Sequence, residues 1–171
     1  MLKNPGVKNG IFAGITILVF SHVCYMINKT QIITGLAYIS YLIPLYFMYR
    51  GAQEEKYKNE GILSFGEALK VSFLIFVICF FFYHVYTYLI FNVIDPSMID
   101  VMKEVSINQA EMIGEFFGIQ DQLEDLPEAI EEQVFAMDFK IIFMNYLVSL
   151  IFPGFIYALI MASVTKREPN A

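Results

Sequence analysis

Charged residues are scarce in this chain, and four long segments contain none at all. Only 16% of the residues are Asp, Glu, Lys or Arg, and 57% are hydrophobic, whereas an ordinary soluble domain is about a quarter charged. The uncharged segments are residues 10–27, 32–49, 71–94 and 141–164. Their hydrophobicity is continuous rather than alternating, which excludes the strands of a membrane barrel. The sequence therefore predicts an all-α integral membrane protein.

We expect four transmembrane helices within a single membrane domain that covers residues 1–171, because a helix needs roughly 20 apolar residues to cross a bilayer. Their expected bounds are about 10–27, 32–49, 68–94 and 139–164. Lys3 and Lys8 precede the first segment as in a signal peptide, but no small-residue cleavage site follows it, so we expect a retained helix.

Cysteines and catalytic motifs are equally sparse. The two cysteines, Cys24 and Cys79, both fall inside uncharged segments, so a disulfide framework is not indicated. The sequence contains no nucleophile elbow, HExxH motif or EF-hand loop, and its predicted spans hold no paired carboxylates. We therefore expect a protein that is not an enzyme, with no cofactor and no nucleic-acid partner.

Basic residues are divided unequally between the two ends of the predicted helices. Three lie on one side: Lys29, Lys103 and Lys140. Eight lie on the other: Lys3, Lys8, Arg50, Lys56, Lys58, Lys70, Lys166 and Arg167. Because basic residues of short connections stay in the cytoplasm, both termini are expected to be cytoplasmic. In a gram-negative cell this predicts a multi-pass inner-membrane protein with a periplasmic insert between the third and fourth helices.

That insert, residues 95–138, carries twelve of the seventeen acidic residues and one lysine, Lys103. Asp95-Pro96 predicts a capped helix that ends near Phe117, since Gly118 is a suitable stop. Four carboxylates fall on one stripe of this helix: Asp100, Glu104, Glu111 and Glu115. Five apolar residues fall on the opposite side: Met98, Met102, Val105, Met112 and Phe116. A second capping pattern at Asp125 predicts another amphipathic helix, so the insert is expected to be an extracytoplasmic helical hairpin.

The two apolar stripes could pack against each other, against the end of the bundle, or in the lipid headgroup region. We favour the first, because interfacial helices are usually basic on their polar face and anionic lipid would repel this segment. The carboxylates have three possible roles. The simplest role is that they only keep the surface of the insert solvated. They could also form a docking surface for a basic protein partner, or bind a divalent cation.

The segment before the third helix contains a capping box, in which the Ser64 hydroxyl and the Glu67 carboxylate satisfy each other's backbone N–H groups. This box lies in the run Gly61-Ile-Leu-Ser-Phe-Gly-Glu-Ala68, and the third helix ends in Phe91-Asn-Val-Ile-Asp-Pro96. With these two motifs, the chain resembles the small four-span bacterial membrane proteins of the family called domain of unknown function 4199, found mainly in Bacteroidetes. The resemblance implies four helices with a charged insert between the third and fourth, and it implies no activity.

Two histidines lie inside the predicted spans at similar expected depth. His22 follows Phe20-Ser21 in the first span, and His84 follows Phe82-Tyr83 in the third. This parallel suggests either a duplicated hairpin or chance matching of apolar letters. If the histidines meet, they could bind a transition metal or relay protons. The simpler interpretation is that each is a hydrogen-bonded packing residue.

Three classes of function remain. We favour a non-enzymatic accessory or interaction component that presents an acidic periplasmic cap, with the lipid bilayer and a basic protein as its partners. A small transporter or channel subunit, which could be linked to cations or metals, comes second, because helices without charged residues line a hydrophilic path poorly. An intramembrane enzyme comes third. The sequence does not specify the oligomeric state.

Overall fold

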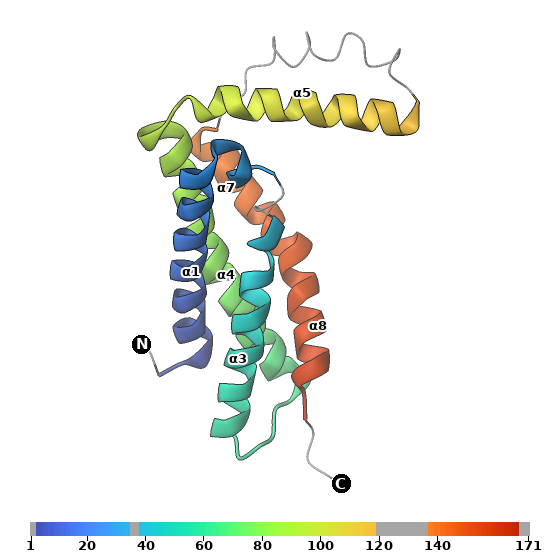
Figure 1. The fold of residues 1–171 in the computed structure, drawn as a ribbon. Helices are drawn as coiled ribbons and strands as arrows, with labels where there is room; N and C mark the ends of the chain where they lie inside the picture. The colour runs from blue at the N-terminus through green and yellow to red at the C-terminus, as the bar shows by residue number, and fades with distance from the viewer. Residues whose placement is uncertain (1–2, 35–37, 119–136, 168–171) are drawn as a thin grey trace.

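The computed structural model describes residues 3–34, 38–118 and 137–167, which contain helices and no β-strand. In chain order the elements are α1 (Pro5–Ile27), η1 (Lys29–Ile32), α3 (Leu42–Lys58), α4 (Phe65–Leu89), η2 (Ile90–Ile94), α5 (Met98–Phe117), α7 (Phe139–Ser149), η4 (Leu150–Phe155) and α8 (Ile156–Thr165). The α1, α3, α4 and α7–α8 segments run along one bundle axis, and α5 lies across one end of it (Figure 1). We call this the α5 end and the opposite end the base. The predicted all-α class is confirmed.

Three helical segments are long and apolar enough to cross a membrane: Pro5–Ile27, Phe65–Ile94 and Phe139–Thr165. They correspond to the first, third and fourth predicted spans. The first helix begins earlier than predicted, because the Asn4 side chain accepts hydrogen bonds from the backbone N–H groups of Gly6 and Val7. Pro5 then takes the first helical position, where its missing N–H costs nothing. Lys8 therefore lies within α1 rather than before it.

The second predicted span, 32–49, differs from the structure in where its helix begins and ends. The 3-10 turn η1 ends at Ile32, and α3 does not begin until Leu42. Pro44 explains this start, because it falls in the first turn of α3, where no intrahelical N–H donor is needed. The Ser40 carbonyl then accepts from the N–H of Ile43. Beyond Tyr49 the helix continues through a charged stretch to Lys58, so only its first half is apolar.

The fourth predicted span is interrupted near its middle. Phe152 has non-helical backbone angles of φ −136° and ψ 116° just before Pro153, inside the wide turn η4. A proline inside a helix removes a hydrogen bond and clashes with the preceding turn, so α7 and α8 are two helices rather than one. Pro44 and Pro153 therefore have different settings, since Pro44 lies in the first turn of a helix and Pro153 interrupts one.

The core of the bundle is built where α1, α3 and α4 meet. The aromatic rings of Phe76 and Phe80 stack with a centroid distance of 4.1 Å, and both side chains are fully buried along with Ile17 and Met48. Helices α1 and α4 approach closely at Gly14, where an added Cβ would lie 2.6 Å from the Phe82 ring. Small residues permit this kind of approach between membrane helices.

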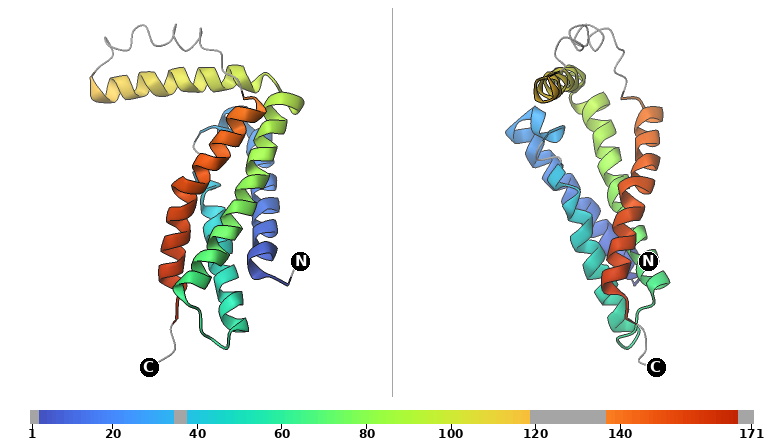
Figure 2. Two further views of the ribbon diagram at one scale, coloured as in Figure 1. Left: turned by 180° about the vertical axis from the view of Figure 1, so that it is seen from behind. Right: turned by 90° about the vertical axis from the view of Figure 1, so that its right-hand side faces the viewer.

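Helix α5 runs across the end of the bundle, and its far end extends beyond the other helices in two opposite views (Figure 1 and the left view of Figure 2). Its predicted end is confirmed, because Phe117 is the last helical residue and Gly118 has a left-handed φ of 66°. Its predicted cap is wrong. The helix begins at Met98 rather than after Asp95, and no side chain caps it. The second insert helix predicted from Asp125 lies outside the described residues.

Candidate functional site at the α5 end

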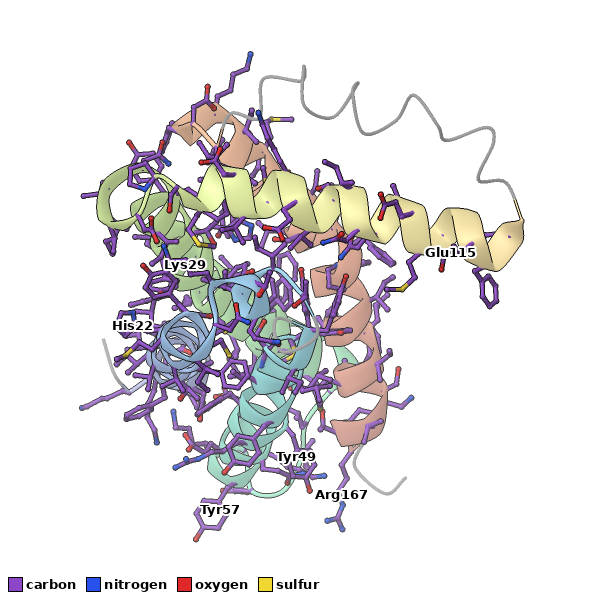
Figure 3. All side chains as sticks on the ribbon, turned by 45° about the horizontal axis from the view of Figure 1, so that its top comes forward. His22, Lys29, Tyr49, Tyr57, Glu115 and Arg167 are labelled. Carbon is purple, nitrogen blue, oxygen red and sulfur yellow. The ribbon has the colours of Figure 1, made fainter. Side chains whose placement is uncertain are left out.

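The joint between α4 and α5 is fastened to the end of α1 by the Asp95 carboxylate. Lys29 Nζ lies 2.6 Å from Asp95 Oδ2, and the Tyr25 hydroxyl donates to the same oxygen at 2.8 Å. The Ser97 hydroxyl donates to Asp95 Oδ1 at 2.5 Å. Figure 3 places Lys29 beneath the start of α5. The carboxylate thus binds groups from α1, from η1 and from the first turn of the insert.

The charges at this joint stabilise each other. Hydrogen bonding from the Lys29 ammonium, with smaller contributions from the hydroxyls of Ser97 and Tyr25, holds the pKa of Asp95 far below its ordinary value. Hydrogen bonding to Asp95 raises the pKa of Lys29. The Asp95 side chain is 13% exposed and the Lys29 side chain 47% exposed, so only the carboxylate partner is sheltered from water. Asp95 therefore fixes the direction in which α5 leaves the bundle, a role that the predicted helix cap did not include.

A buried hydrophobic cluster supports the first half of α5 on the bundle. Met98 packs with Ile32 of η1, Tyr86 of α4, and Ile90 and Phe91 of η2, and Met102 packs against the same cluster. Both methionines belong to the predicted apolar stripe. The stripe therefore packs against the bundle end along this half of α5. The sequence had favoured packing against the apolar stripe of the second insert helix.

The four residues of the predicted acidic stripe, Asp100, Glu104, Glu111 and Glu115, are all exposed. Asp100 and Glu104 border a shallow hollow on α5 together with Lys103 and Ile107. Figure 3 places Glu115 at the far end of the helix, well away from the bundle. The four carboxylates thus form a line along a helix whose first turn is attached to the bundle.

A cavity of about 370 Å³ lies beneath the start of α5, between α4, α7, η4 and the segment around residue 40. Its lining includes Met102 of α5, Met137, and aromatic and aliphatic side chains. Polar groups also line it: Tyr38, Tyr41, Tyr83, His84, Thr87, Asn145 and Ser149. A cavity of this size with a few polar groups on apolar walls is typical of small-molecule sites.

The two predicted histidines do not form one site. His22 Nδ1 lies 3.0 Å from the Tyr86 hydroxyl, whereas His84 Nδ1 lies 2.8 Å from the Phe80 carbonyl oxygen and the ring contacts Tyr146 of α7. Tyr86 and His84 are two positions apart on α4, about 200° around the helix. They therefore face different neighbours. Among the described residues, no three His, Cys, Asp or Glu side chains are grouped to hold a metal ion.

The hydrogen bond of His84 determines the chemistry that its ring can offer. A carbonyl oxygen can only accept, so Nδ1 carries the hydrogen when the ring is neutral, and Nε2 is left as an acceptor. His84 borders the cavity and an adjoining apolar hollow on the α7 side. A hydrogen-bond donor could therefore bind at His84 Nε2, whereas the ring of His22 is exposed and lies beside the Tyr86 hydroxyl.

Comparison with known proteins supports a family assignment. A family model described as "Protein of unknown function (DUF4199)" matches residues 8–167. The chain belongs to the DUF4199 family. No curated protein and no solved structure matches it. The match extends over α1, the Asp95 joint, α5 and the cavity walls, and this confirms the resemblance drawn from the sequence motifs.

The base of this DUF4199 chain holds the second predicted polar feature, the capping box. Ser64 N–H donates to Glu67 Oε2 at 3.0 Å, and Glu67 N–H donates to Ser64 Oγ at 3.3 Å. The prediction of this cap is confirmed. The box begins α4 at Phe65, and close by, the backbone of Leu63 pairs with that of Arg167 through two hydrogen bonds. Local sequence was sufficient to identify the cap, but the pairing with the end of the chain depends on the fold.

A charged cluster between α1 and α3 was not found from the sequence. Lys8 Nζ lies 2.9 Å from Glu54 Oε2, Asn9 Nδ2 donates to the same oxygen at 3.2 Å, and Arg50 Nε lies 3.5 Å from Glu54 Oε1. Burial raises the pKa of Glu54, but the hydrogen bonds from Lys8 and Asn9 and the charges of Lys8 and Arg50 lower it by more. These residues lie at the base, away from the cavity, and their role is to join two helices.

Proposed function

We propose that this DUF4199 chain is a multi-pass inner-membrane protein that acts as a non-enzymatic accessory component and presents α5 to a basic partner on the periplasmic side. The observation that supports this proposal is the attachment of α5. Its start is held by Asp95 and by buried Met98, while its four carboxylates remain exposed. A rigid row of like charges attracts an oppositely charged surface and speeds its association.

The path of the chain supports four membrane crossings. The three long apolar helices account for three of them. From η1 at the α5 end, the chain returns to the base through the segment around residue 40 and then α3, which packs against both α1 and α4 (Figure 1). The remaining crossing would therefore include the apolar half of α3. Packing against two neighbours can satisfy the backbone there.

The distribution of charge supports the orientation. The base contains Lys8, Arg50, Lys56 and Lys58, and α1 begins and α8 ends there (Figure 1). The α5 end contains the acidic stripe. Retention of basic connections in the cytoplasm would place the base inside the cell and α5 in the periplasm.

The test uses matched neutralising variants in living membranes. Glu111→Gln with Glu115→Gln removes two exposed charges from α5. Glu55→Gln with Glu60→Gln removes two charges from the base, where Glu55 is half-buried and Glu60 is exposed. After chemical cross-linking and purification in mild detergent, we expect the same basic partner with the unmodified protein and the base variant. The α5 variant should lose it, and high salt should weaken it. Equal recovery with both variants would reject the docking role.

A second candidate, a transporter or channel subunit, is favoured by the cavity beside His84. Its polar lining could hold a solute within the membrane. A continuous path from this cavity to the base is not favoured, because Phe80 and Phe76 are buried on α4 one and two turns nearer the base than His84. Solute flux into proteoliposomes that His84→Ala changes, but Glu111→Gln with Glu115→Gln does not, would favour transport. Absence of flux in both would leave the docking role as the better account.

A further inference from the structure

The far half of α5 carries apolar side chains that no described part of the bundle covers. Phe116 is 82% exposed, Met112 and Phe117 are each 68% exposed, and Ile113 is 52% exposed. Four large apolar side chains within six residues form a continuous exposed patch. A patch of this kind marks a contact with a partner or a membrane.

The direction of this patch follows from the first half of the same helix. Met98 is fully buried against the bundle end. Phe116 lies 18 positions later, which is about five turns at 3.6 residues per turn, so its side chain leaves the helix in the same direction. Met112 lies within about 40° of that direction. Phe116 and Met112 therefore face the side of α5 on which the bundle lies. Ile113 and Phe117 lie on the flank of that side, about 60° and 100° from the direction of Met98, and Glu111 faces away from it.

The position of α5 identifies what lies on that side. The helix begins four residues after Ile94, the last residue of a segment long enough to span the membrane, so it lies near the level at which that segment leaves the bilayer. It lies across the end of the bundle and extends past the other helices (Figures 1 and 2). Where α5 extends past the bundle, the surface beneath its apolar patch is the surface of the surrounding lipid.

We propose that Met112, Ile113, Phe116 and Phe117 rest in the lipid bilayer at the boundary between headgroups and acyl chains. An amphipathic helix in this position buries its apolar face roughly 5–10 Å into that boundary. The burial of apolar area provides the binding energy, and the carboxylates on the opposite side stay in water. Because those carboxylates give no attraction to anionic lipid, the contact suits a surface of zwitterionic headgroups. This inference requires only that the bundle spans the membrane, and it is independent of a basic partner.

The chain contains no tryptophan, so a single introduced tryptophan reports its own surroundings. We would reconstitute Phe116→Trp in phosphatidylcholine vesicles with and without lipids brominated near the headgroup end of their acyl chains. Glu111→Trp, on the opposite side of the same helix, is the control, and Met112→Trp is a second reporter if Phe116→Trp fails to fold. The expected result is blue-shifted emission that brominated lipid strongly quenches for Phe116→Trp, with red-shifted and unquenched emission for Glu111→Trp.

Every other pattern overturns the proposal. Red-shifted, unquenched emission from Phe116→Trp would place the patch in water. Blue-shifted but unquenched emission would mean that protein covers it, from this chain, a second copy or another partner. Equal quenching of Phe116→Trp and Glu111→Trp would mean that α5 is immersed with no preferred face. Loss of a basic partner from the docking variants can occur together with any of these results, so the two proposals fail separately.

Discussion

Gly14 offers the most direct test of how closely α1 packs on α4. A Cβ at this position would lie 2.6 Å from Phe82 Cδ2 and 3.2 Å from Phe82 Cβ. Because the shorter distance is far below van der Waals contact, Gly14→Ala forces the ring or α1 itself to move. Overpacking of a close-packed interior typically costs about 1–3 kcal/mol. The same substitution also removes a flexible glycine from a helix, which is worth roughly 0.5–1 kcal/mol in the opposite direction.

Gly66→Ala is the matched control. Gly66 lies in the first turn of α4, and a Cβ there would meet no atom within 4 Å. Both variants replace a helical glycine with alanine, so most of the gain in helix stability cancels between them. The difference in their free energies of unfolding then isolates the clash. We expect Gly14→Ala to be the less stable of the two by about 1–3 kcal/mol.

The assay is unfolding in mixed detergent micelles by titration with sodium dodecyl sulfate, followed by circular dichroism. Phe82→Ala removes the obstructing ring, so Gly14→Ala should cost little in that background, and the two substitutions should be strongly non-additive. Equal stability of Gly14→Ala and Gly66→Ala would refute the close approach of α1 and α4. Additive effects of Gly14→Ala and Phe82→Ala would show that this ring is not the obstacle.

Three further predictions concern polar contacts. Asp95→Asn and Lys29→Met should each speed amide exchange at the start of α5. Because the pKa of Asp95 is depressed in the folded protein, the carboxylate stabilises the fold fully above its unfolded-state pKa. This stabilisation is lost only as the pH falls through the lower folded-state pKa. Glu54→Gln should destabilise the bundle by about 1 kcal/mol after allowance for partial exposure, with the loss largely absent in a Lys8→Met background. The Glu54 pKa is also lowered, so its contribution should fade below the ordinary Glu range. Ser64→Ala should cost about 1 kcal/mol in the same detergent titration.

Features encoded by neighbouring residues were predictable from the sequence. The Ser64–Glu67 box, the end of α5 at Gly118 and the acidic stripe each depend on positions within one helix or one turn, where backbone geometry alone fixes the relation. The long apolar segments were predictable for the same reason. The start of α3 was not, because hydrophobicity continues through residues 32–41 although the helix begins only at Leu42.

Features formed between helices were not predictable in the same way. Lys29 and Asp95 are 66 positions apart, whereas the partners in each predicted helix cap are only a few residues apart. Only the meeting of η1 with the α4–α5 joint brings Lys29 and Asp95 to 2.6 Å. Because His22 and His84 were expected at similar depth, the sequence allowed them to meet. In the structure their side chains contact different neighbours, since depth does not determine the direction in which each side chain leaves its helix. Asp95 did carry a signal that could have been used. It is the first acid after an uncharged span, on the same side of the membrane as the isolated Lys29.

The two sides of α5 together determine where the acidic stripe lies. If the apolar side contacts the bundle near Met98 and lipid near Phe116, the carboxylates must face water whether or not a partner exists. The docking role therefore depends on the fixed attachment of α5 at Asp95 and Met98, and it must be tested separately from membrane contact. Phe116→Trp combined with Glu111→Gln and Glu115→Gln separates the two roles. Partner loss with unchanged quenching by brominated lipid would mean that the charges themselves are recognised. Partner loss with altered quenching would mean that the charges act by setting the depth of α5 in the membrane.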